Sequence, residues 1–401
     1  MSRTKIINDP VHGFIQVPGG ILQDLINHPY MQRLSRIRQI SLGHYVYPGA
    51  HHTRFHHALG ALHLMQEALS ILRIKGIPIT AAEYTDACIA ILLHDIGHGP
   101  FSHTLENILI GVSHETLSLA FMEELDRQYG GQLGGAIAIF RQACPRRFLT
   151  QLVSGQLDMD RLDYLSRDSF FTGVTEGVVG YSRIIKMLQV ADGNLVVEEK
   201  GIYSLEKFLI ARRLMYWQVY LHKTVLAAEK MLQKIMERAR LLLREERLLA
   251  VAPALGYFMM HEISSSQVRE DASGLLRRFA ALDDVDILMA VKTWQHEPDN
   301  ILAILCRNLM ERRLFQLTFS DSPPSRQLVA AACERIGNLY GEEAIPYFVL
   351  EGKESNHAYS EATGEIRILR KDGQVRSLTA SMDYPLPTKD IEKYYLCTLR
   401  T

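Results

Sequence analysis

The chain has 401 residues, 47% of them hydrophobic and 22% charged, which is enough for a large core and for two or three domains. A net charge of −1 and a pI near 7.0 give no global basic field for nucleic acid and no acidic excess that would favour disorder. The N-terminus shows no signal peptide, and no apolar run approaches the ~20 residues that span a bilayer. The five cysteines are scattered without a CxxC pair, so we expect a cytoplasmic protein with reduced thiols and no membrane contact.

Histidine is unevenly distributed along the chain. Twelve of the 16 histidines lie in residues 1–114. Imidazole is a common metal ligand and the usual acid–base group near neutral pH. The crowding therefore predicts a site built mainly in the first third of the chain.

The first 50 residues predict a small arm and two helices. Alternating apolar residues over 5–17 flank an Asp-Pro/His-Gly turn, which indicates a short hairpin or an extended arm. A helix over 21–26 ends before Pro29, and a second is predicted over 31–40. The second helix has a basic side, which is either a solvated face or a functional one: Arg33, Arg36 and Arg38.

A histidine-rich segment follows at 51–60. Thr53 can cap a helix that runs to about Ile74. Arg54 and His57 are three residues apart and share a face of that helix. An arginine beside a metal-ligating histidine is a natural grip for phosphate.

The stretch from His94 to His103 organises the rest of the chain. Thr80 and Glu83 form a capping box that opens a helix whose apolar end delivers His94 and Asp95. Imidazole and carboxylate together suit a divalent transition metal. His98 and His103 follow in a segment broken by Gly and Pro. The alternative is a pair of satisfied core polar residues with two surface histidines.

A second polar block lies at 154–168. Asp160, Tyr164 and Asp168 recur at i, i+4 and i+8, which is one stripe of one helix, while Asp158 and Asp163 are placed on other faces. Such a stripe is usually solvated. Here it offers the further carboxylate that a metal site needs.

The remaining chain predicts helices and then strands. Residues 176–205 look irregular, with a hairpin between 195–197 and 201–203, and 205–248 reads as helical. Within it Arg212, Tyr216 and Tyr220 form a stripe that could bind phosphate and stack a base, or that simply packs in the core. Further helices begin near 283 and 299, and strands follow from 346 with a hairpin turn at 371–373. We expect an arm over 1–20, a helical core with its extension over 21–320 and a small α+β region over 321–401.

These motifs together resemble a known family. The matching strings are 7–13 (INDPVHG), 47–50 (YPGA) with Arg54-Phe55-x-His57, 94–103 (HDIGHGPFSH), and 160–164 (DRLDY) with Arg167-Asp168. The chain resembles HD-domain phosphohydrolases, most closely the deoxynucleotide triphosphohydrolase branch that includes the vertebrate SAM- and HD-domain enzymes. The resemblance runs from about residue 5 to 225, and it implies a mostly α fold, an HD-domain helical core with a small C-terminal α+β cap.

The resemblance also implies roles for single residues. It gives as metal ligands His57, His94, Asp95 and Asp160, and as catalytic residues His98, His103 and His114, with Glu106 orienting His103. It gives as triphosphate-binding residues Arg54, Arg161, Tyr164 and Arg212. Gln39 and Asp168 match the positions that read the sugar 3′-hydroxyl, Ile40 crowds the 2′ position, and Tyr220 packs near sugar and base. The cofactor would be one divalent metal, with manganese, iron, nickel, zinc and magnesium left open.

The implied activity is metal-dependent hydrolysis of a deoxynucleoside triphosphate to deoxynucleoside and inorganic triphosphate, by a homodimer or homotetramer. One alternative keeps the HD chemistry on a monophosphate, an alarmone or another phosphoester. The other is a nucleotide-sensing or nucleic-acid-binding protein, a partner class that the near-neutral charge does not favour. Asn27 and Ser35 replace the Asp and Arg with which vertebrate relatives read an activating guanine nucleotide. Gln32, Arg33 and the arm remain as an alternative activator site.

Overall fold

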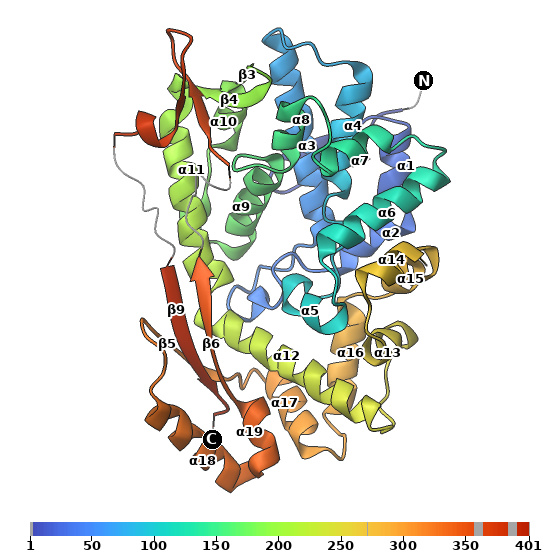
Figure 1. Cartoon of the computed structure of the whole chain (residues 1–401), viewed down its shortest axis with the longest axis vertical. Coiled ribbons are helices and arrows are strands. Elements are labelled where there is room, and N and C mark those ends of the chain that lie inside the picture. The colour runs from blue at the N-terminus through green and yellow to red at the C-terminus, as the bar shows by residue number, and fades with distance from the viewer. Residues whose placement is uncertain (1–2, 271, 357–363, 384–390, 401) are drawn as a thin grey trace.

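A computed structural model describes residues 3–270, 272–356, 364–383 and 391–400. The molecule is elongated, with a helical core at one end and a smaller region of helices and one sheet at the other (Figure 1). The prediction of a mostly α fold with a C-terminal α+β region is confirmed.

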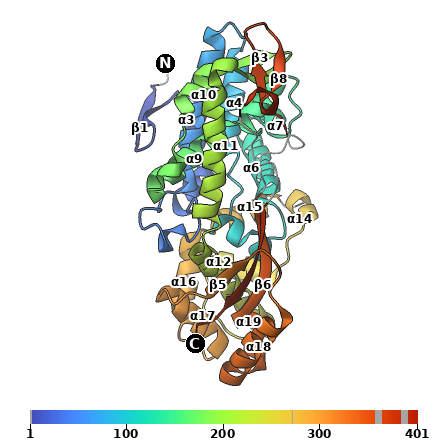
Figure 2. The ribbon, with the colours of Figure 1, turned by 90° about the vertical axis from the view of Figure 1, so that its left-hand side faces the viewer.

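The N-terminal arm is a hairpin at the edge of the helical core (Figure 2). β1 (Lys5–Asp9) pairs antiparallel with β2 (Gly13–Val17), which confirms the predicted hairpin. The Asp9 carboxylate closes the turn by accepting hydrogen bonds from the backbone N–H groups of Val11 and His12, at 3.0 and 2.9 Å. These bonds set the position of His12, which reaches the site described below.

Three capped helices build the core and carry the metal-binding motifs. α3 (Arg54–Ile74) begins after Thr53, and α4 (Ala81–Leu93) begins after the Thr80 and Glu83 capping box, both as predicted. α9 (Met159–Thr172) is capped by Asp158, whose side chain accepts from the N–H of Arg161 at 2.7 Å. α3 packs against both other helices and is buried on most of its faces, because it lies at the centre of the bundle.

The other helices surround these three and extend the molecule. They are α1 (Ile21–Asn27), α2 (Pro29–Gln32), α5 (Glu106–Leu109), α6 (His114–Gln128), α7 (Gly134–Phe140), α8 (Arg147–Val153), α10 (Tyr181–Met187), α11 (Ile202–Met215), α12 (Lys223–Arg244), α13 (Pro253–Met260), α14 (Ser265–Glu270), α15 (Ala272–Ala280), α16 (Asp284–Trp294), α17 (Asn300–Met310), α18 (Arg326–Tyr340) and α19 (Ile345–Phe348). The single helix expected over 205–248 is interrupted by a π-helical turn at Tyr216–Tyr220, before α12.

Two further sheets lie at opposite ends of the molecule (Figure 2). β3 (Leu188–Ala191) and β4 (Asn194–Glu198) form a hairpin that β7 (Arg367–Leu369) and β8 (Val375–Ser377) extend, β4 and β7 being parallel. The other sheet has the order β5 (Gln316–Ser320), β9 (Ile391–Thr398), β6 (Val349–Asn356). The predicted turn at 371–373 does join β7 to β8, whereas the predicted pairing of 195–197 with 201–203 is wrong, because residues 202–215 are helical. β5 lies before the boundary expected at 321 and pairs with β9 beyond it, and the division into domains stays a prediction.

The prediction of a helix over residues 31–40 is wrong for most of its length. α2 ends at Gln32, a 3₁₀ turn covers Arg33–Arg36, and Ile37 is extended. Tertiary bonds explain the change, because Ile37 O accepts from Arg54 N at 2.9 Å and Arg38 N donates to Asp284 at 3.0 Å.

Arg33 does not belong to a solvated basic face. Its side chain is fully buried and donates to the Ile96 carbonyl at 2.8 Å, with the guanidinium 4.9 Å from the Phe279 ring centroid. Burial lowers its pKa to about 9. A guanidinium enclosed in this way cannot reach a nucleotide at the surface, which removes Arg33 from the alternative activator site.

Candidate active site

Four polar side chains from three helices converge in the core. His57 lies on the first turn of α3, His94 and Asp95 follow α4, and Asp160 lies on the first turn of α9. Asp160 Oδ1 is 3.1 Å from His57 Nε2 and 3.5 Å from His94 Nε2, and Asp95 Oδ1 is 3.4 Å from His94 Nε2. These four residues, the metal cluster, are those for which the sequence predicts metal binding. The fold brings all of them together.

Both histidines turn Nε2 toward the same point. His57 Nδ1 donates to Asp163 at 2.7 Å and His94 Nδ1 donates to the Ile91 carbonyl at 2.6 Å, which fixes each ring with Nδ1 protonated. The two Nε2 atoms lie 3.3 Å apart and both face Asp160, so that either a proton shared with this carboxylate or a metal cation separates their lone pairs. This arrangement of nitrogen and carboxylate donors fits one divalent metal ion and leaves its identity open.

The electrostatics of the cluster also favour a cation. Burial alone would lower the pKa of His57, but Asp160 and Asp163 raise it to about 10. Burial would raise the pKa of Asp160, but hydrogen bonds from His57 and His94 lower it. The carboxylates therefore attract positive charge to this point.

A second layer holds His57 in place. Asp163 is fully buried and accepts hydrogen bonds from His57, from His12 at 2.6 Å and from Arg167 at 2.9 Å. Arg167 in turn pairs with Asp9 at 2.8 Å. Sequence reasoning placed Asp163 on another face and gave it no role, although its spacing of three residues from Asp160 puts both on one wide face of a helix.

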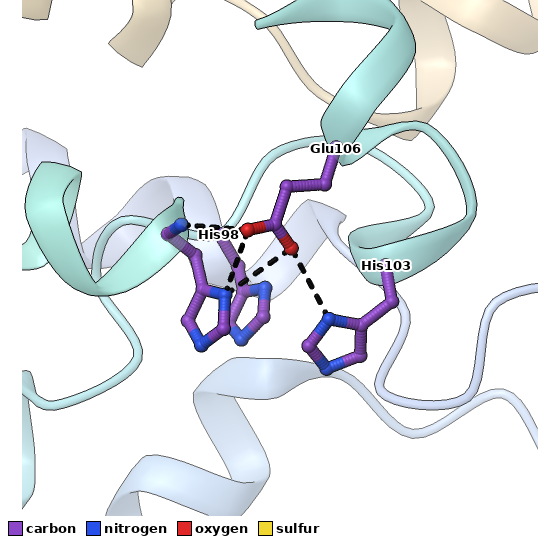
Figure 3. A group of neighbouring side chains, drawn as sticks. His98, His103 and Glu106 are labelled. Atoms are coloured by element: carbon purple, nitrogen blue, oxygen red, sulfur yellow. Dashed lines mark hydrogen bonds and ion pairs between the residues drawn. The ribbon is translucent and has the colours of Figure 1, made fainter. Parts of the chain in front are cut away.

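Three histidines and a glutamate form a second group, the histidine group, which Figure 3 shows. It lies next to the metal cluster, because His98 contacts Asp95. The rings of His98 and His114 stack with centroids 3.9 Å apart, and that of His103 lies 4.9 Å from His98. Glu106 accepts from His103 Nδ1 at 3.2 Å and from His114 Nδ1 at 3.0 Å, so it orients two rings rather than His103 alone. Burial would raise the pKa of Glu106, but its bonds to these histidines lower it, so the carboxylate is ionised near neutral pH.

Asp95 connects the metal cluster to the histidine group. One of its oxygens lies 3.3 Å from His98 Nε2, and the other is ion-paired with Arg54. Arg54 is buried and also donates to Ser102 at 2.7 Å. Burial and the Arg54 charge hold the pKa of His98 well below its usual value, so its ring is neutral.

A cavity of about 500 Å³ opens onto both groups. It is lined by Asp95 and Asp160, by His98, His103 and His114, and by six of the eight predicted substrate residues: Gln39, Ile40, Arg54, Tyr164, Asp168 and Tyr220. Its size suits a small-molecule ligand. The fold therefore brings most of the predicted site residues around one space.

The other two predicted phosphate residues do not line this cavity. Arg161 is ion-paired with Asp158 at 2.5 Å and also donates to the Gly155 carbonyl. Arg212 donates to Gln156 at 3.1 Å. Both side chains would have to move to contact a ligand in the cavity.

Asp168 is held by two partners that were not assigned to it from the sequence. It accepts from His52 Nε2 at 2.6 Å and from the Tyr220 hydroxyl at 2.7 Å. His52 is buried and its ring stacks on Phe171, with centroids 4.6 Å apart. His52 thus belongs to the site, a role that the sequence analysis did not assign to it.

The comparison with protein families agrees with the fold and the site. An HD domain model matches residues 54–168 and an HD associated region model matches 179–249. The chain belongs to the HD-domain phosphohydrolase family, and it is a hydrolase of the metal-dependent kind.

Individual relatives are similar along nearly the whole chain or along about half of it. A phosphohydrolase structure from Bacteroides thetaiotaomicron has 48% identity and a TM-score of 0.96, over 99% of this chain and 100% of that one. The protein YwfO of Bacillus subtilis is 30% identical over 94% of this chain and 88% of its own length. The deoxynucleoside triphosphate triphosphohydrolase SAMHD1 of Homo sapiens is 30% identical over 55% of this chain, which spans 42% of that protein.

Proposed function

We propose that this protein hydrolyses deoxynucleoside triphosphates to deoxynucleosides and inorganic triphosphate. One observation carries the proposal. The same cavity is bounded by residues of the metal cluster, by the histidine group and by the predicted sugar-contacting residues. The similarity to SAMHD1, whose name states this activity, supports it. That similarity covers only about half of this chain.

His57, His94, Asp95 and Asp160 would hold the metal. When bound there, a divalent metal supplies Lewis-acid polarisation of a phosphate oxygen and lowers the pKa of water. Arg54, beside Asp95, would offset the negative charge of the phosphates.

His103 would protonate the leaving 5′ oxygen. Its side chain is 69% exposed and lines the cavity, so it can approach a substrate. The Glu106 carboxylate accepts from Nδ1 and so directs Nε2 away from itself. Glu106 is therefore a positioning residue for this proton transfer.

A second candidate function keeps the same chemistry on another phosphoester, such as a nucleoside monophosphate or an alarmone. It is favoured by the bonding of Arg161 to Asp158 and of Arg212 to Gln156, because neither arginine lines the cavity and Arg54 is the one arginine on its wall among the described residues. Homo-oligomerisation stays a prediction, which light scattering after gel filtration would check. Within the described ranges, every helix falls short of the length and apolarity that a bilayer crossing demands.

A hydrolysis screen tests the proposal. Metal-reconstituted protein would be incubated with each dNTP, each rNTP, dNMPs and guanosine tetraphosphate, alone and with GTP added, and the products separated by ion exchange. His94→Ala is the inactive control, and His296→Ala, an exposed histidine, is the matched control. Deoxynucleoside plus triphosphate, released by the wild type and by His296→Ala only, would support the proposal. Phosphate or pyrophosphate from another substrate would favour the second candidate, and nucleotide binding without turnover would refute both.

A further inference from the structure

One wall of the active-site cavity is formed by a single face of α12. Leu226, Glu229, Lys230 and Gln233 all line the cavity. Their spacing of three, four and seven residues places them on one stripe of a helix. This stripe contributes none of the metal ligands or catalytic histidines, and the proposed function gives it no role.

Glu229 is a carboxylic acid enclosed in the cavity wall without a cation paired to it among the described residues. The nearby hydroxyls of Ser41 and Thr104 bond to each other at 2.8 Å. Burial raises the pKa of Glu229 to about 7, although hydrogen bonds from the Thr104 and Ser41 side chains act to lower it. Such a group is costly to bury, so its place in a ligand cavity indicates a role toward a ligand.

The neighbouring polar groups are already oriented. Gln233 donates its amide N–H to the Thr104 carbonyl at 2.9 Å, which fixes the side chain and leaves its oxygen as an acceptor. Lys230 is ion-paired at 3.2 Å with Glu354 of β6, which also lines the cavity. This part of the cavity therefore offers more acceptors than donors, and its cation is neutralised.

We propose that Glu229 and Gln233 read the hydrogen-bonding edge of the nucleobase, and that they favour guanine most and thymine least. The inference rests on the proposed function, which places the phosphates at the metal cluster and Arg54. The base then extends toward α12, because the carboxyl groups of Glu229 and Glu354 in this part of the cavity form a poor phosphate site.

The ranking follows from the donors that each base presents. Guanine has adjacent N1–H and N2–H₂ donors, which match the carboxyl of Glu229 together with the amide oxygen of Gln233. Adenine and cytosine each present one amino group. Thymine presents a single N3–H between two carbonyls, which would face the acceptors unpaired. A site built around hydrogen bonds rejects a ligand that lacks its partners more strongly than a hydrophobic pocket does.

The test compares kcat/KM for dGTP, dATP, dCTP and dTTP in the wild type and in Glu229→Gln. The matched control is Glu237→Gln, an exposed glutamate two turns along the same helix that pairs with Lys234. We expect Glu229→Gln to lower kcat/KM for dGTP by about tenfold, the value of one hydrogen bond to a charged group, with dTTP changed by less than about twofold. Glu237→Gln should leave all four values unchanged.

A second measurement needs no mutation. The wild type would be compared on dGTP and dITP, which differ only in the 2-amino group, and dITP should be poorer by about tenfold. An equal loss on all four substrates in Glu229→Gln, or equal use of dGTP and dITP, would overturn base reading while leaving the hydrolysis itself in place. Failure of the wild type to release triphosphate from any dNTP would instead overturn the proposed function.

Discussion

A methyl group added at Gly60 tests whether Asp163 and its hydrogen-bond partners hold His57, a predicted metal ligand, in place. Gly60 lies on α3 one turn after His57 and faces Asp163 and Arg167. A Cβ at this position would lie 2.7 Å from the carboxyl carbon of Asp163, whereas ordinary contacts lie between 3.4 and 4 Å. Gly60→Ala must therefore displace the carboxylate that fixes His57.

The sizes of the opposing effects decide the sign. Alanine in a helix gains about 1 kcal/mol over glycine. Overpacking a core costs about 1–3 kcal/mol, and disrupting a buried ion pair costs about 3–5 kcal/mol. We expect a net loss of at least about 1 kcal/mol in the free energy of unfolding, and a 10- to 100-fold loss of metal affinity, roughly the usual effect of changing a partner of a metal ligand.

Chemical denaturation with chelator present measures the stability of the apoprotein. Titration of the metal-free protein with Mn²⁺, after the chelator is removed, measures metal affinity. Gly134→Ala is the control, because Gly134 begins α7 and a Cβ there meets nothing within 4 Å. The control should be as stable as the wild type or slightly more so. If Gly60→Ala matched the control in both stability and metal affinity, the reasoning about the Asp163 layer would be refuted.

Three further predictions concern Glu106, Asp9 and Arg33. Glu106→Gln should lower kcat by about 10²-fold and alter the pH–rate profile, with little change in KM, because two histidine rings lose their orientation. The control Glu115→Gln, at an exposed neighbouring position, should leave kcat and the pH–rate profile unchanged. Burial would raise the pKa of Asp9, but Arg167 lowers it below 3.8, so the ion pair stabilises the fold above that pH and the contribution is lost as pH falls through the lowered value. Asp9→Asn should accordingly be less stable than the wild type by about 3 kcal/mol at pH 7, with the difference shrinking below pH 4, and a constant difference in urea midpoints would contradict this. Arg33→Met should cost about 1–3 kcal/mol by thermal denaturation, because it leaves a buried carbonyl unpaired, and an unchanged melting temperature would show that the bond to that carbonyl is weak.

The sequence predicted best what local chemistry determines. Thr53 and Thr80 start α3 and α4 at the expected residues, since N-capping bonds involve only the neighbouring turn. The metal-binding motif was visible because His94 and Asp95 are adjacent and the resemblance supplied His57 and Asp160. The fold places all four together, and their role as ligands stays a prediction.

What the sequence did not predict depends on distant partners. Residues 37–40 have helical spacing, but their backbone bonds go to residues near 52–54 and to Asp284 instead. Arg33 looked like a surface charge, and only the packing of Phe279 and the Ile96 carbonyl around it explains its burial. The parallel partner of β4 could not be found locally, because β7 lies about 170 residues further along the chain.

The pairing of β4 with β7 determines when this sheet can be completed during synthesis of the chain. Translation at about 5–20 residues per second needs roughly 10–30 s to pass from β4 to β7. During this interval the β3–β4 hairpin has an open edge that could pair with another nascent chain. Asp160 has by then left the ribosome with the other predicted ligands, so the metal site can assemble while the sheet still waits for its last two strands. Synthesis is thus ordered so that the part of the fold proposed to do chemistry can form early and the open edge of β4 is covered late.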